Sequence, residues 1–175
     1  MARTIEINRA PVLTLWAAVV AERMGFQEDE ALSLGRAVAG LNAQAKGRRL
    51  GLFAPKEGGA RAARAQKRGE EFWIEVCGRP VPAKNTAEGA RAVKGDAVIE
   101  AAGARVYLEK KFGDALGDAR RAMRRLAAAF EAEDLAPRAF GLYEEFRPAI
   151  PRGVRGWGAK GVLDLAKVAA LAPRA

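Results

Sequence analysis

Residues 11–24 read P-V-L-T-L-W-A-A-V-V-A-E-R-M and form the most apolar segment that predicts a helix in this chain. Pro11 suits the first turn of a helix, and Gly25 suits its end. Large apolar side chains cover most of the circumference of that helix: Val12, Leu13, Leu15, Trp16, Val19 and Val20. A helix that is apolar on nearly every side belongs in the interior of a protein. We therefore expect this helix to be central and buried.

Further helices are predicted along the chain by apolar periodicity and by capping residues. They are expected from the acidic residues 28–30 to about Ala45, from Asp96 to Lys111, from Asp114 to near Phe130, from Asp134 to Phe146, and from Asp164 to about Leu171. Residues 3–8 alternate in polarity and predict either a short edge strand or an extended arm. Residues 72–77 predict a strand, and Pro80 and Pro82 extend the next segment. The fold class predicted is mainly α: one compact helical domain over residues 1–175, with five or six helices and a small β component near residues 72–82.

The composition describes a globular protein, since 50% of its 175 residues are hydrophobic and 29% are charged. No apolar run reaches the roughly 18 residues that a membrane span needs. Glu6 and Arg9 lie just before the first apolar stretch and argue against a signal peptide. We therefore expect a cytoplasmic protein without a membrane partner. Cys77 is the single cysteine, so no internal disulfide can form.

Several common chemistries are excluded by residue types that the chain lacks. It contains no histidine, which removes Ser-His-Asp and Cys-His nucleophilic pairs and histidine metal sites. One cysteine cannot build a zinc site or an iron–sulfur cluster. Neither the phosphate-binding P-loop nor a dinucleotide-binding G-x-G-x-x-G is present. Lysine or carboxylate catalysis remains formally open, but no residue is singled out as catalytic, and we expect neither a cofactor nor a metal.

The net charge of +9 makes a polyanion the first partner to consider. Cations and amides that suit phosphate and base contacts gather at the end of the second helix and in the following basic loop 56–68. A second group lies in the glycine-rich loop 152–161, where a tryptophan could stack on a base. The predicted nucleic-acid contacts are Asn42, Gln44, Lys46, Arg48, Arg49, Arg61, Arg64, Lys67, Arg68, Arg155, Trp157 and Lys160.

Each of these features also has a structural interpretation. Cations at a helix C-terminus complement the helix dipole, and Trp157 can fill the core between tight glycine turns. The arginines of residues 120–125 lie on one side of the helix predicted from Asp114. They could hold a phosphate backbone, or form a solvated face that Asp114 and Asp118 partly neutralise.

Three segments resemble a group of short prokaryotic proteins without an established activity. They are R-A-P-V-L-T-L-W-A-A-V-V-A-E-R at 9–23, L-N-A-Q-A-K-G-R-R-L-G at 41–51, and F-R-P-A-I-P-R-G-V-R-G-W-G-A-K-G at 146–161. The resemblance implies no catalytic residue and no cofactor. It implies only that the unit is complete as it stands.

The function predicted is non-enzymatic binding of nucleic acid, most simply DNA, by basic helix-end and loop patches. Two alternatives stay open: a helical protein–protein adaptor or regulator, and an enzyme acting on a phosphorylated small molecule bound in the loop 152–161. The chain leaves homo-oligomer formation open. The nucleic-acid hypothesis requires that the scattered cations become neighbours when the helices pack.

Overall fold

A computed structural model describes residues 3–45, 60–150 and 159–173. Of this part of the chain, 57% is helical and 23% is strand, in two antiparallel sheets of two and four strands. The predicted mainly α class is therefore wrong, and the fold is α+β. The elements follow in the order β1 (Thr4–Asn8), α1 (Arg9–Arg23), α2 (Glu28–Ala45), α3 (Ala60–Arg64), β2 (Glu71–Val76), β3 (Arg79–Thr86), β4 (Gly89–Lys94), β5 (Ala97–Val98), α4 (Ala101–Phe112), a 3₁₀ turn (Gly113–Ala115), α5 (Leu116–Ala128), α6 (Ala132–Phe146), β6 (Lys160–Asp164) and α7 (Leu165–Ala170).

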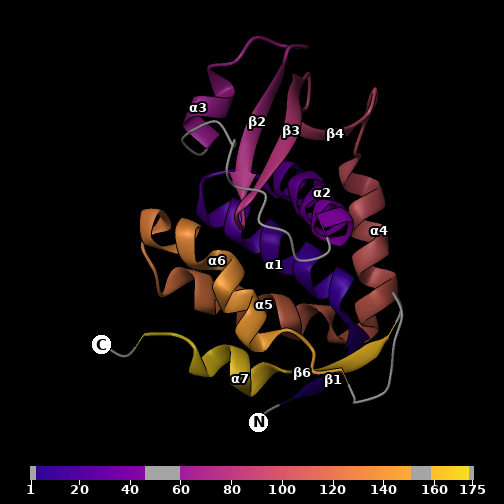
Figure 1. Cartoon of the computed structure of the whole chain (residues 1–175), viewed down its shortest axis with the longest axis vertical. Coiled ribbons are helices and arrows are strands. Elements are labelled where there is room, and N and C mark those ends of the chain that lie inside the picture. The colour runs from indigo at the N-terminus through magenta and orange to yellow at the C-terminus, as the bar shows by residue number, and fades with distance from the viewer. Residues whose placement is uncertain (1–2, 46–59, 151–158, 174–175) are drawn as a thin grey trace.

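Helix α1 is the centre of the structure, as the sequence predicts. Every residue from Pro11 to Ala21 is buried. Helices α2, α4, α5 and α6 all contact it, and Figure 1 shows it running through the middle of the molecule. The indole of Trp16 donates a hydrogen bond to the Ala139 carbonyl at 2.9 Å, and its ring meets that of Phe146 edge to face at 5.3 Å. A buried tryptophan needs such an acceptor for its N–H, so α6 is fixed to α1 by this contact.

Helices α1 and α2 pack with their backbones unusually close at Gly35. A Cβ placed on Gly35 would lie 2.5 Å from the carbonyl oxygen of Thr14 and 2.9 Å from the nitrogen of Ala18. Only glycine, which has no Cβ, fits between those two backbone atoms. On the same helix, Gly40 is exposed, and a Cβ there would meet no atom within 4 Å.

The larger sheet has the strand order β2-β3-β4-β5 and covers one side of α2. Its buried face carries Ile74, Val76, Val81, Ala83 and Ala92. The sheet extends far beyond the predicted β component near residues 72–82. The sequence pattern does not predict the full sheet because β3 contains two prolines, Pro80 and Pro82, which are rare in central strands. Both lie in the part of β3 that is paired with β2, at Pro80↔Glu75 and Pro82↔Trp73, whereas the pairs between β3 and β4 begin at Ala83.

Two polar side chains of α2 attach the helix to β4. The buried Glu30 carboxylate accepts hydrogen bonds from the backbone N–H of Gln27 at 2.9 Å and of Ala90 at 2.8 Å. The Ser33 hydroxyl accepts from Ala92 N–H at 2.9 Å and donates to the Ile99 carbonyl at 2.6 Å. Buried polar groups are tolerated when they are bonded in this way.

The smaller sheet pairs β1 with β6, so residues near the two ends of the described chain lie side by side. The register runs from Thr4↔Asp164 to Asn8↔Lys160. The alternation of residues 3–8 predicts an edge strand or an extended arm, and the strand is confirmed. Asp164 then caps α7 by accepting a hydrogen bond from the Ala166 N–H at 3.0 Å, as predicted. No helix within the described residues is both long and apolar enough to cross a membrane.

Candidate functional site

The predicted nucleic-acid contacts fall into three groups. Five of them lie outside the described residues: Lys46, Arg48, Arg49, Arg155 and Trp157. Gln44 and Arg61 lie in helices α2 and α3, but the structure does not describe their side chains. The remaining five are placed with their side chains, and they occupy three separate regions.

Asn42 is engaged within the protein. Its amide oxygen accepts a 2.7 Å hydrogen bond from the buried guanidinium of Arg79, which also lies over the Phe140 ring at 5.2 Å. Burial lowers the pKa of Arg79 from its usual value. The contact ties α2 to the β2–β3 hairpin, which gives Asn42 a structural role.

Arg64, Lys67 and Arg68 gather at the opposite end of α2. Glu30 and Asn42 are 12 residues apart on that helix, which corresponds to about 18 Å. Arg64 and Arg68 line a hollow of about 510 Å³, here called the polar hollow. Its other lining residues are Gln27, Glu30, Gln66, Asn85, Thr86, Ala87, Glu88 and Gly89. Two cations and three amide side chains thus meet in one place.

Asn85 organises the polar hollow. Its side-chain amide donates to the backbone carbonyls of Ala63 and Gln66, both at 2.9 Å, and its backbone carbonyl accepts from the Gly69 N–H at 3.2 Å. Arg64 donates to the Gly25 carbonyl at 3.2 Å and lies 3.7 Å from the Glu30 carboxylate. These bonds hold the end of α3 against the start of α2 and leave Lys67 and Arg68 exposed.

Lys160 lies on β6, far from the polar hollow. Figure 1 shows β6 and α3 at opposite ends of the molecule. Among the described residues, the predicted contacts therefore do not form one surface, although Arg64 and Arg68 line the same hollow and Lys67 is next to Arg68 in the chain.

The arginines of α5 are partly neutralised, in line with the alternative interpretation of a solvated face. The Asp118 carboxylate forms an ion pair with the guanidinium of Arg3 at 2.6 Å and a second one with that of Arg121. The guanidinium of Arg124 lies 3.1 Å from the Glu22 carboxylate. The hydrogen bond from Arg3 lowers the pKa of Asp118 below its usual value. These pairs reduce the positive field of the helix.

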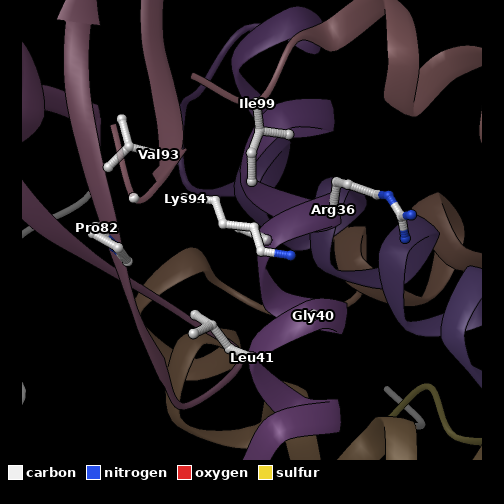
Figure 2. Close-up of a pocket in the computed structure, with 9 residues that line it drawn as sticks. Arg36, Gly40, Leu41, Pro82, Val93, Lys94 and Ile99 are labelled. Carbon is white, nitrogen blue, oxygen red and sulfur yellow. The ribbon is translucent and has the colours of Figure 1, made fainter. Parts of the chain in front are cut away.

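A second hollow lies between α2 and β4, and no pattern in the sequence predicts it. This α2–β4 groove has a volume of about 460 Å³ and is lined by Arg36, Ala37, Gly40, Leu41, Pro82, Val93, Lys94, Gly95 and Ile99. Figure 2 shows Lys94 extending from β4 between Ile99 and Leu41, and Arg36 extending away from the strands. The groove is assembled from three segments distant in sequence, so no local motif marks it.

Cys77 carries the single thiol of the chain, and its burial limits the access of any reactant to that thiol. It is buried in the turn between β2 and β3, and burial raises the pKa of its thiol. A thiol is a weak nucleophile while it stays protonated. Within the described residues, no cluster of three or more Cys, Asp or Glu side chains could hold a metal ion.

Comparisons with known proteins do not assign this chain to a family. The resemblance of residues 9–23, 41–51 and 146–161 to short prokaryotic proteins stays a prediction. Comparisons with models of known protein families, with curated proteins and with solved structures return no match.

Proposed function

We propose that this chain is a non-enzymatic nucleic-acid-binding protein and that the polar hollow is its contact surface. The observation that carries the proposal is the meeting of the exposed Arg68 with the amides of Gln27 and Gln66 in one hollow, which the internal bonds of Arg64 and Asn85 hold together. Arginine side chains bind phosphate oxygens, while amide side chains donate to and accept from base edges. The net charge of +9 supplies the long-range attraction.

Two carboxylates, those of Glu30 and Glu88, also line the polar hollow and oppose the charge of its two arginines. Glu30 is buried and bonded to two backbone N–H groups, so part of its charge is balanced within the protein. Glu88 is exposed at the rim and would repel a phosphate. Replacing Glu88 by Gln is therefore expected to strengthen binding of an oligonucleotide.

The test measures binding of fluorescent single-stranded and duplex oligonucleotides by anisotropy over a range of salt concentrations. Lys67 and Arg68 are exposed, so their joint replacement by Gln leaves the fold intact. If both contact phosphates of a duplex, the slope of log K against log salt becomes shallower by about 1.8. The matched control is the joint replacement of Lys110 and Lys111 by Gln on the exposed side of α4, which removes the same charge.

The control decides between a defined surface and general attraction. The proposal expects the α4 variant to keep the wild-type slope. Equal weakening in both double variants would show that only the total charge matters. Absence of binding by the wild-type protein at low salt would refute nucleic-acid binding altogether.

Two other functions predicted from the sequence are a protein–protein adaptor and an enzyme that acts on a phosphorylated small molecule. Both stay predictions. Large apolar side chains exposed on the described surface are Trp73, Val106 and Val162. They belong to β2, α4 and β6 and so lie on three separate elements. An adaptor surface would be expected to bring such side chains together in one patch.

A further inference from the structure

The α2–β4 groove combines apolar walls with positive charge. Its walls are formed by Ala37, Leu41, Pro82, Val93 and Ile99. Its volume of about 460 Å³ lies within the range of roughly 300–1,000 Å³ that small-molecule sites occupy. A ligand that fills it must therefore bring an apolar body of modest size.

Two cations border these walls, from different elements. Arg36 comes from α2 and Lys94 from β4, and none of the described residues that line the groove is acidic. Figure 2 shows that the charged ends of both side chains point away from β3 and β4. A ligand with its body in the groove would carry its negative group on this side, where both cations lie.

The side chain of Arg36 is held in position by stacking on the aromatic ring of Tyr107. Its guanidinium carbon lies 3.9 Å from the centre of the Tyr107 ring on α4. Stacking uses the flat face of the guanidinium, and the N–H groups point outward in its plane. That edge can bind a carboxylate or a phosphate through two parallel hydrogen bonds.

We propose that the α2–β4 groove binds an amphiphilic organic anion, with its apolar body against Leu41, Pro82 and Ile99 and its carboxylate or phosphate head at Arg36 and Lys94. This site does not depend on the proposed nucleic-acid function. The polar hollow is built by other residues, near the start of α2.

The first test uses 8-anilinonaphthalene-1-sulfonate, which joins an aromatic body to one anionic group, and follows its fluorescence on titration with the protein. N-phenyl-1-naphthylamine is the matched neutral probe, because it has the same aromatic body without the sulfonate. The anionic probe is expected to bind at least tenfold more tightly. Equal affinity of the two probes would overturn the proposal, since the cations would then contribute nothing.

Variants locate the binding. Arg36→Gln and Lys94→Gln are each expected to weaken the anionic probe about tenfold, the loss typical of one charged hydrogen bond, and to leave the neutral probe unchanged. Lys111→Gln is the control for loss of one charge outside the groove. Lys94 is exposed, so its replacement tests the site without disturbing the stack of Arg36 on Tyr107. Equal weakening by the control would refute the site.

Gly40→Leu tests the groove by filling it. Gly40 lines the groove, and a side chain there meets open space rather than protein atoms. Leucine also favours a helix more than glycine does, so the variant is expected to fold at least as well as the wild type. Both probes should lose at least tenfold in affinity, while oligonucleotide binding stays unchanged. Undiminished probe binding by this folded variant would overturn the proposal.

Competition identifies the head group. Hexanoate and hexyl phosphate are titrated against the bound anionic probe, with inorganic phosphate as the third arm. Displacement by hexanoate supports a carboxylate ligand, and displacement by hexyl phosphate supports a phosphate ligand. If neither displaces the probe, or if inorganic phosphate displaces it as well as hexyl phosphate does, an amphiphilic anion is not the ligand.

Discussion

The close approach of α1 and α2 can be measured with one substitution made at two positions. Gly35→Ala places a methyl group 2.5 Å from the Thr14 carbonyl oxygen, whereas Gly40→Ala places it in open space on the same helix. Alanine favours a helix over glycine by about 1 kcal/mol, and both variants share that gain. The difference between them therefore isolates the cost of forcing the two helices apart.

We expect that difference to be about 1–3 kcal/mol, the usual cost of an overpacked core. Gly40→Ala should unfold at a higher urea concentration than the wild type, and Gly35→Ala at a lower or similar one. In a chain of this length, each kcal/mol corresponds to about 2–4 °C in the unfolding midpoint. Circular dichroism against urea gives the free energies, and unchanged m-values show that the compactness of the two end states is unaltered. Equal stability of the two alanine variants would refute the close approach.

Three further outcomes follow from buried groups. Glu30→Gln turns an amide N–H₂ toward a backbone N–H and should cost about 1.5–3 kcal/mol in urea unfolding, while the exposed Glu28→Gln should change little. Burial raises the pKa of Tyr143 to about 12. Its phenol therefore ionises first in the unfolded chain, and stability should fall as pH rises from the usual tyrosine value toward 12, less steeply in Tyr143→Phe. Cys77 should stay unreactive to a thiol reagent such as DTNB until denaturant is added, and rapid labelling of the folded protein would contradict its burial.

Features that depend on neighbouring residues could be predicted from the sequence. The buried helix α1 follows from its apolar circumference, and the cap at Asp164 follows from its position before a short apolar helix. The strand at residues 3–8 follows from alternation, although its partner β6 could not be foreseen. In each case the determining interactions lie within a few residues.

The larger sheet and the groove depend on contacts between distant residues. β3 reads R-P-V-P-A-K-N-T, and prolines usually argue against a central strand. They are accommodated because Pro80 and Pro82 precede the residues of β3 that pair with β4. Helix α3, which contains Arg64, and strand β6, which contains Lys160, lie at opposite ends of the molecule, and this separation likewise follows from topology alone. The net charge of +9 therefore favours a polyanion as partner, but it does not predict which surface of the protein would bind one.

The pairing of β1 with β6 has a consequence for the protein as it leaves the ribosome. Residues 4–8 are synthesised before their partners, residues 160–164, and residues 9–159 are added in between. At about 5–20 residues per second, that interval lasts roughly 8 to 30 seconds. During it, Ile5 and Ile7 lack the strand that pairs with them in the finished fold. Until β6 is synthesised, the β1 segment of the nascent chain has no partner strand, and an unpaired strand edge of this kind can pair with another copy of the chain.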